Sequence, residues 1–192
     1  MTDILKPGAG ILFMKVGIHA RESLDDIIAR KSKEIEDTGY AMWGYGGNTC
    51  HPRTMVRPFT DAFANKGPIF LCMQEIRSNH SAEPLRARES SVDGLNWEPI
   101  PKSINVNGSK FALVIKGLRR QDLVLPLERT KVAVGQNRGR VGSRYVRGRV
   151  DKACLEIGVE PERTNVEDKK LIPINLVAEL ASPFAVFLRN DR

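Results

Sequence analysis

Short apolar runs bounded by glycine or proline recur along the chain and predict buried strands. Residues 10–17 and 68–74 are the clearest examples in the first half. The same pattern predicts strands over residues 109–116, 131–134 and 145–157, and more weakly over 84–89. Residues 117–122 indicate a turn, and the proline in the short apolar segment 123–127 confines that segment to an edge of a sheet or to an exit from it. Strands therefore carry most of the expected regular structure.

One segment breaks this pattern with helical spacing. Leu24, Ile27, Ile28 and Ile35 recur at intervals that place them on one face of a helix. Ser23 can accept a hydrogen bond from the backbone amide three residues later, as in a capping box. The pattern predicts a long helix over residues 23–37, ended at the glycine of residue 39.

A second, shorter helix is predicted over residues 58–65. Pro52 and Pro58 each favour the first turn of a helix, and the Arg57–Pro58 step disfavours a single helix through both prolines. Together these elements indicate an α+β domain with a mixed, barrel-like β-sheet, one long helix and one short helix. The expected organisation is an N-terminal tail (1–9), one domain (10–157), a charged linker (158–170) and a C-terminal packing segment (171–192).

The balance of charged residues indicates which class of partner the protein binds. The 192 residues include 30 Lys and Arg against 23 Asp and Glu, a formal net charge of +7. Such a surface favours a polyanionic partner such as nucleic acid. The three cysteines are widely spaced and odd in number, which predicts free thiols in a reducing, intracellular compartment. The sequence shows neither a signal peptide nor an apolar tract suited to a membrane span, so no membrane partner is expected.

Residues 40–52 combine aromatic side chains with three glycines, which predicts a ligand-binding loop between two regular elements. Trp43 and Tyr45 offer aromatic faces on which a base could stack, and Asn48 offers an amide that both donates and accepts hydrogen bonds. Trp97 has the same aromatic chemistry, and Lys15, within the first expected strand, is a further candidate base-binding residue. The alternative is a solvated connection whose Trp43 packs into the core.

A second constellation is rich in arginine and glycine. Its cationic members are Arg138, Arg140, Arg144, Arg147, Arg149 and Lys152. Arginine pairs with two phosphate oxygens at once, and glycine lets the backbone approach a strand, so this segment predicts a phosphate clamp. Within the strand expected over 145–157, Arg147 and Arg149 would share one face. The alternative is a basic hairpin that is merely solvated.

The order of these features resembles YTH and EVE domains, which belong to the PUA-like superfamily. The residues that carry the resemblance are 13–16, Trp43, Asn48, 61–63, 68–71, Trp97, 108–115 and 119–126. The resemblance covers about residues 10–157 and implies that Trp43 and Trp97 form the walls of a base-binding cage. It implies further that Asn48 reads the edge of the base, including a modified base.

Catalysis and metal binding have weaker support in the sequence. His19, His51 and His80 form no recognisable set, and the adjacent Cys50 and His51 rarely converge on one ion without a third ligand. A binding module that needs no cofactor is the simpler hypothesis.

Two alternatives stay open. Residues 13–28 and 43–47 are also similar to the start of an ADP-ribosyltransferase, which implies an NAD-using enzyme in which His19 holds the nicotinamide ribose and Glu156 is a candidate catalytic carboxylate. The other is a small-nucleotide binder that uses the backbone amides of residues 46–49 as an anion site.

Overall fold

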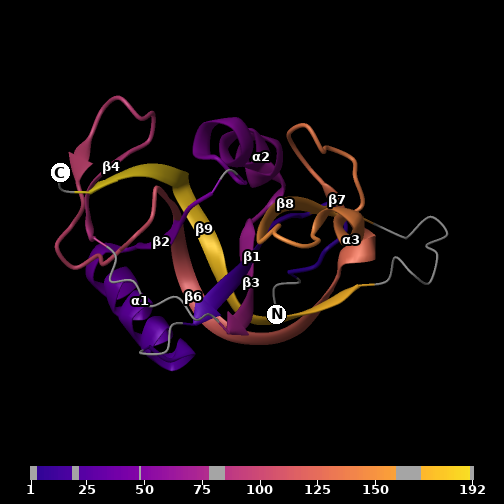
Figure 1. Ribbon diagram of the computed structural model, residues 1–192, viewed down its shortest axis with the longest axis horizontal. Coiled ribbons are helices and arrows are strands. Elements are labelled where there is room, and N and C mark those ends of the chain that lie inside the picture. Colours follow the sequence, from indigo (N-terminus) through magenta and orange to yellow (C-terminus); the bar gives the residue numbers. More distant parts are fainter. Residues whose placement is uncertain (1–3, 19–21, 48, 78–84, 159–169, 191–192) are drawn as a thin grey trace.

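A computed structural model describes residues 4–18, 22–47, 49–77, 85–158 and 170–190, and Figure 1 shows its elements. The strands are β1 (Gly10–Ile18), β2 (Ala41–Tyr45), β3 (Phe70–Arg77), β4 (Ala87–Ser91), β5 (Glu98–Pro99), β6 (Phe111–Pro126), β7 (Thr130–Val132), β8 (Lys152–Ile157) and β9 (Leu171–Asn190). The helices are α1 (Leu24–Thr38), α2 (Arg57–Phe63) and α3 (Gly142–Tyr145), with a π-helical turn η1 (Pro52–Val56) and 3₁₀ turns η2 (Ala64–Lys66) and η3 (Leu127–Arg129). No helix among the described residues is both long and apolar enough to cross a membrane.

The sheet is mixed, which confirms the α+β class. Its main path runs β2-β6-β9-β3-β1-β8-β7, and the β4–β5 hairpin joins it through β9. Only β1 and β3 pair in parallel, while the other neighbours are antiparallel. The expected barrel-like closure is wrong, because β2 and β7 stand at opposite ends of this path and do not pair with each other in the described sheet.

Strand β9 lies inside the sheet, between β6 and β3, and crosses the molecule in Figure 1. The expected C-terminal packing segment is thus an internal strand, and the prolines of this tract did not prevent it from pairing with β6. Strand β6 likewise continues through the turn expected at residues 117–122. The residues that indicated a turn lie where the pairing of β6 with β9 is irregular, because its register shifts twice between Lys116 and Leu123.

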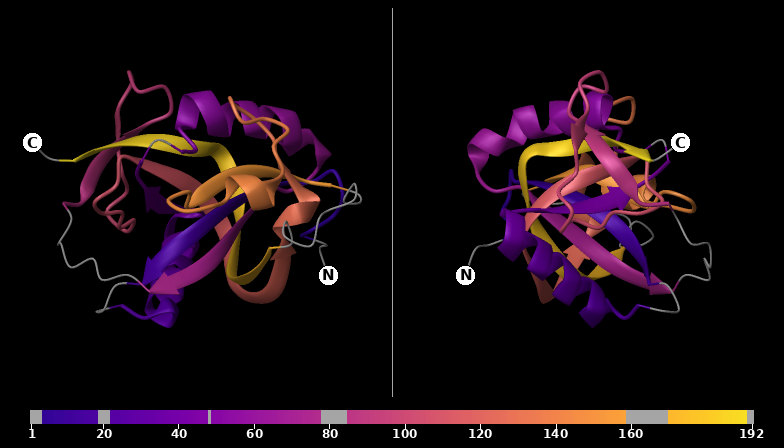
Figure 2. Two further views of the ribbon diagram at one scale, coloured as in Figure 1. Left: turned by 45° about the vertical axis from the view of Figure 1, so that its right-hand side comes forward. Right: turned by 90° about the vertical axis from the view of Figure 1, so that its left-hand side faces the viewer.

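Two core clusters occupy opposite faces of β1. Leu12, Met14 and Val16 belong to the larger cluster, to which the buried faces of α1 and α2 contribute. Ile11 and Phe13 belong to the second cluster, together with buried residues of β7 and β8. In Figures 1 and 2, α2 lies at the top of the molecule and α1 at its lower end. Successive side chains of β1 point to opposite faces of the strand, so one face lines the larger cluster and the other lines the second cluster.

Helix α1 confirms the prediction from helical spacing and capping. The Ser23 hydroxyl accepts a hydrogen bond from the Asp26 amide, and the Asp26 carboxylate accepts one from the Ser23 amide. Gly39 ends the helix at φ 86°, in the left-handed region that glycine adopts without strain. The periodicity did not foresee that Lys31 and Glu34 are buried on this helix as an ion pair.

The loop expected at residues 40–52 is partly a strand, β2, which is a correction. The residues of β2 do not alternate between buried and exposed positions, but they pair with β6 along the whole strand. The short helix expected over residues 58–65 is confirmed as α2 followed by η2, and Pro52 begins a separate π-helical turn, η1, that precedes α2 without an intervening loop. The Arg57 amide donates to the Pro52 carbonyl five residues back, and this wider turn leads directly into the helix that holds Pro58.

A pronounced bend interrupts β9 beside α2. Leu113 pairs with Ala185 and Ile115 with Leu180, so a single residue of β6 faces four residues of β9. The extra residues form a bulge that ends at Phe184, whose φ of 70° is uncommon for a residue other than glycine. Bulges of this kind redirect side chains, and here the bulge turns β9 towards α2.

Candidate functional site

Three partly exposed rings meet at one end of the sheet. The ring centroids of His51 and Phe111 are 5.2 Å apart, those of His51 and Phe187 5.4 Å, and those of Phe111 and Phe187 5.6 Å. All three pairs are edge-to-face, the arrangement that aromatic quadrupoles favour. We call His51, Phe111 and Phe187 the aromatic cluster.

Strand register and a helix start bring these rings together. Tyr45, Phe111 and Phe187 occupy one rung across β2, β6 and β9. His51 precedes η1, and its Nδ1 accepts a hydrogen bond of 3.3 Å from the Arg53 amide. Residues that are far apart in the sequence thus form one aromatic surface next to the start of η1.

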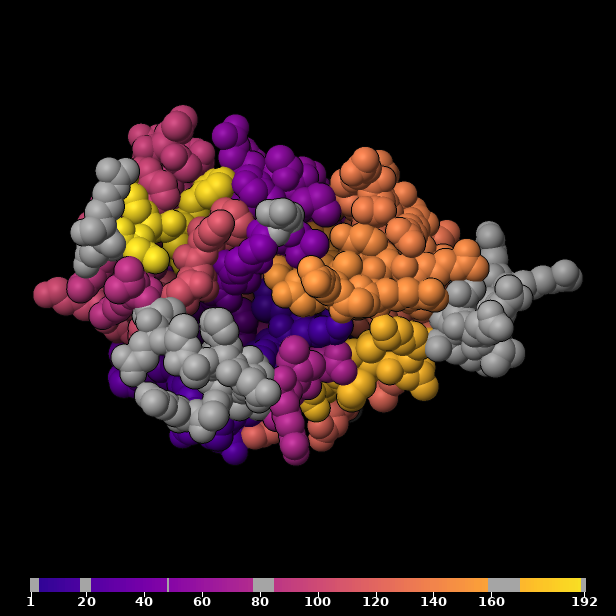
Figure 3. Space-filling model, in the orientation of Figure 1, coloured from indigo at the N-terminus to yellow at the C-terminus, as the bar shows by residue number. Residues whose placement is uncertain are grey.

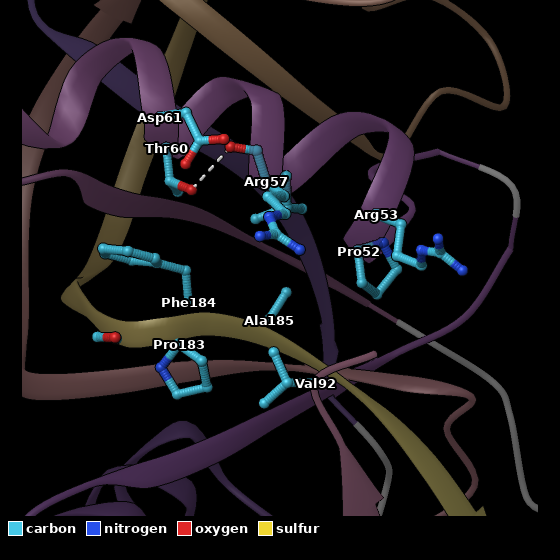
Figure 4. Close-up of a pocket in the computed structure, with 11 residues that line it drawn as sticks. Pro52, Arg53, Arg57, Thr60, Asp61, Val92, Pro183, Phe184 and Ala185 are labelled. Carbon is cyan, nitrogen blue, oxygen red and sulfur yellow. Dashed lines mark hydrogen bonds between the residues drawn. The ribbon is translucent and has the colours of Figure 1, made fainter. Parts of the chain in front are cut away.

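A shallow hollow opens between the helical segment and the bend of β9 (Figure 4). Its volume is about 190 Å³. It is lined by Pro52, Arg53, Val56, Arg57, Thr60, Asp61, Val92, Ser182, Pro183, Phe184 and Ala185. Sites that enclose a small molecule usually measure roughly 300–1,000 Å³. The hollow therefore suits one group of a larger ligand better than a whole enclosed molecule.

Two arginines border this hollow from the helical side. In Figure 4, Arg57 reaches into the gap between the helix and β9, whereas Arg53 points outwards. Both are exposed, and neither guanidinium has an ion pair or hydrogen-bond partner in the part of the chain that the structure describes. Asp61 is an acidic neighbour on the same wall. The wall therefore presents two cations against one anion.

The hollow and the aromatic cluster are neighbours. His51 directly precedes Pro52, which lines the hollow, and Ala185 and Phe187 lie two residues apart on β9. On the opposite wall, a Cβ atom at Gly94 would lie 3.6 Å from the Phe187 ring, and Val92 of the same segment lines the hollow. Because alternate residues of a strand share a face, aromatic and cationic groups border one continuous surface.

The arginine-rich segment, residues 135–151, lies on the other side of η1. Arg138, Arg140, Arg144, Arg147 and Arg149 are all exposed. A Cβ atom at Gly135 would lie 2.5 Å from the Sδ of Met55, so this segment packs directly against η1. Figure 3 shows it, in orange, beside the purple helical segment on one face of the molecule. The arginine-rich segment therefore lies beside the helical turn that carries Arg53.

The local structure of this segment differs from the prediction. The strand expected over residues 145–157 begins only at Lys152, so Arg147 and Arg149 do not share a strand face. They lie in the connection from α3, where Arg147 Nε donates to the carbonyl oxygen of Ser143. Lys152 itself is buried and pairs with Asp151 at 2.8 Å, which removes it from the clamp.

The open aromatic pocket expected around Trp43 is wrong. Trp43 is 7% exposed and Tyr45 6% exposed, and both belong to the larger core cluster. Pairing of β2 with β6 turns both side chains to the inner face of the sheet. Burial raises the pKa of the Tyr45 phenol, whose hydroxyl donates to the carbonyl oxygen of Cys50.

The other residues assigned to the base site are dispersed. Trp97 is partly exposed and stacks beneath the Arg189 guanidinium at 4.6 Å, and no ring contact within the described residues joins it to Trp43. Lys15 lies on β1 between Met14 and Val16 and thus faces the side opposite to Trp43. Asn48 lies outside the described residues. Trp43 and Trp97 therefore do not contact each other as the walls of one cage.

The structure describes only part of the residues named for the catalytic alternatives. Glu156 lies within β8, opposite Gly10 and Lys131, and both His19 and His80 fall outside the described residues. Among the residues that the structure describes, no group of three His, Cys, Asp or Glu side chains could hold a metal ion.

Comparison with protein-family models, with curated protein sequences and with solved structures found no match to this chain. The function of the protein is therefore inferred from the geometry of this surface.

The sequence interpretation did not identify the aromatic cluster or the two arginines of the hollow. One signal was available, because Arg53 and Arg57 are four residues apart in a helical segment and thus share a face. The meeting of Phe111 with Phe187 had no local signal, because it depends on the pairing of β6 with β9.

Proposed function

We propose that this protein binds single-stranded nucleic acid on the surface formed by the aromatic cluster, the hollow and the arginine-rich segment. The observation that carries the proposal is the junction of three partly exposed rings with two arginines that lack partners among the described residues. Bases stack on aromatic faces, at roughly 1–3 kcal/mol per base, while arginines neutralise phosphates.

A polymer fits this surface better than a free nucleotide. The hollow is too small and too open to enclose a nucleotide, yet the basic surface extends past it to five more arginines. One base seated at the rings would leave phosphates on either side to meet Arg53, Arg57 and the arginine-rich segment. Membership of the PUA-like superfamily is part of the proposal, and the order of β1, α1, β2, α2 and β3 supports it. The three free cysteines support a reducing compartment.

The proposal is tested by fluorescence anisotropy with labelled oligonucleotides of one sequence as single-stranded RNA, single-stranded DNA and duplex. The test variant is Arg53→Gln/Arg57→Gln. The matched control is Lys33→Gln/Lys116→Gln, which removes the same charge from α1 and β6, where the two lysines pair with Asp37 and Glu179.

We expect a single strand to bind and the test variant to lose at least about tenfold in affinity, as two phosphate contacts are removed. The control should change affinity by less than about threefold, because those lysines lie away from the surface. Equal losses in the two variants, or no binding of any strand at low salt, would contradict the proposal. Preference for the duplex would exclude base stacking at the cluster.

A further inference from the structure

Two cysteine sulfurs lie in contact inside the larger core cluster. The Sγ atoms of Cys50 and Cys154 are 3.7 Å apart, although the residues are 104 positions apart in the sequence. Both side chains are 1% exposed. The third cysteine, Cys72, belongs to the second cluster, on the other side of the sheet. The fold therefore selects one pair of thiols out of three.

The two cysteines lie in different backbone settings. Cys154 is in β8, opposite Leu12 of β1, with strands on both sides. Cys50 follows β2 and a glycine pair, outside regular structure, and has φ 57°. A disulfide has an S–S distance of about 2.05 Å, so the sulfurs must approach by less than about 2 Å. Because the Cys50 carbonyl oxygen is held by the Tyr45 hydroxyl, rotation of the cysteine side chains supplies this approach.

We propose that Cys50 and Cys154 form an oxidative modification site, in which a peroxide converts the two thiols into an intramolecular disulfide. One sulfur attacks the O–O bond of hydrogen peroxide and becomes a sulfenic acid, while the departing hydroxide leaves as water with the thiol proton. The second sulfur then displaces the sulfenic hydroxyl, which leaves as a second water with the second thiol proton. Two thiols lose two electrons, and one peroxide accepts them.

The environment determines how the site responds. The hydrogen bond with Cys50, together with burial, raises the pKa of the Cys154 thiol, which keeps it protonated and slows its reaction. Sustained oxidant is therefore needed, and the buried bond should then resist reduction. The disulfide would fix the residue that precedes His51 of the aromatic cluster. The modification itself is independent of whether the protein binds nucleic acid.

The test counts thiols in folded protein treated with excess hydrogen peroxide. After the peroxide is removed, the protein is denatured, alkylated with iodoacetamide and weighed intact. Reduced protein should take up three alkyl groups, one for each cysteine. Oxidised protein should take up one, and peptide mapping should place it on Cys72 and show a peptide that joins Cys50 to Cys154.

Three variants separate this site from general oxidation. Cys72→Ala should still form the disulfide and then take up no alkyl group. Cys50→Ser and Cys154→Ser should each form no intramolecular bond, and wild-type protein oxidised in denaturant should lose the pairing preference. The wild-type peptide map decides the matter even where a serine variant folds poorly.

A stability readout adds an independent check. The disulfide would close a loop of about one hundred residues, so the melting temperature should rise by roughly 5–15 °C and return on reduction. Retention of three reactive thiols, stable sulfinic or sulfonic acids at Cys50 or Cys154 without a crosslink, or a bond to Cys72 would overturn the proposal.

Discussion

The phenolic oxygen of Tyr45 donates a hydrogen bond of 2.7 Å to the carbonyl oxygen of Cys50. Tyr45 ends β2, whereas Cys50 lies beyond the glycine pair in a left-handed conformation that costs free energy for any residue but glycine. The bond therefore ties the segment that leads to His51 back to the sheet. It is buried, so neither partner can exchange it for water.

Tyr45→Phe should lower the free energy of unfolding by about 1–3 kcal/mol, because the Cys50 carbonyl loses its buried donor. Chemical denaturation measures this loss. Tyr40→Phe is the matched control, since the Tyr40 hydroxyl makes no hydrogen bond within the described residues and should change stability by less than about 0.5 kcal/mol. Equal effects of the two substitutions would show that the bond does not hold the segment.

The buried ion pair of α1 gives a second prediction. Lys31 Nζ lies 2.9 Å from a Glu34 carboxylate oxygen, and the pair also bonds the backbone of Asn105. Glu34→Leu should cost about 3–5 kcal/mol of unfolding free energy, because Lys31 is left buried without its partner. Lys31→Met/Glu34→Leu should recover part of this loss, and only part, because Asn105 then lacks both bonds. A double variant less stable than the single one would contradict this account.

The same pair predicts a pH dependence. Burial lowers the pKa of Lys31 to about 8, although the Glu34 charge opposes the shift. An unfolded lysine titrates near 10.4, so between about pH 8 and pH 10.4 the unfolded state binds more protons. The stability contributed by Lys31 should thus rise with pH across this window and fall as pH decreases through 8. The measurement is the difference in unfolding free energy between wild type and Lys31→Met/Glu34→Leu, and a flat difference would argue against a shifted Lys31.

Local patterns predicted the elements that depend on neighbours in the sequence. Helix α1 could be predicted because its cap, its apolar face and its terminal glycine all lie within one segment. The α+β class followed from the alternation of short apolar runs with this helix. The open pocket at Trp43 could not be judged in this way, because glycine and aromatic residues suit a ligand loop and a strand that packs inwards equally well.

The sequence did not predict the pairing of strands that are far apart along the chain. Residues 171–192 were expected only to pack onto the domain, yet this tract forms a strand that pairs with β6, β3 and β4. The bulge before Ala185 and the meeting of Phe111 with Phe187 both depend on that pairing. The arginines could be assigned to a basic surface from the sequence, whereas their position next to η1 required the contact between Gly135 and Met55.

The arginine-rich segment leads to a prediction about salt. Arg138 and Arg140 are exposed on the turn that packs against η1. If they contact phosphates, Arg138→Gln/Arg140→Gln should reduce the slope of log affinity against log salt concentration by about 0.7 for each arginine. Anisotropy titrations at several salt concentrations measure the slope. Lys33→Gln/Lys116→Gln should leave it unchanged, and an unchanged slope in the arginine variant would remove this segment from the interface.

The last prediction separates base stacking from charge. Phe187 contacts both His51 and Phe111, so Phe187→Leu opens the aromatic cluster while it keeps an apolar side chain on β9. We expect the affinity for a single strand to fall about fivefold to a hundredfold, which corresponds to the roughly 1–3 kcal/mol of one stacked base. The salt slope should stay as in wild type, because no cation has been removed.

An abasic oligonucleotide of the same length supplies the matching change in the ligand. Wild type should bind it more weakly than the normal strand, whereas Phe187→Leu should bind the two with nearly equal affinity, because each change alone already removes the stacked base. Such non-additivity identifies the ring and the base as one interaction. Melting curves of the variant establish that it is folded. Additive losses would mean that the bases lie elsewhere and that the strand is held at this surface by its phosphates alone.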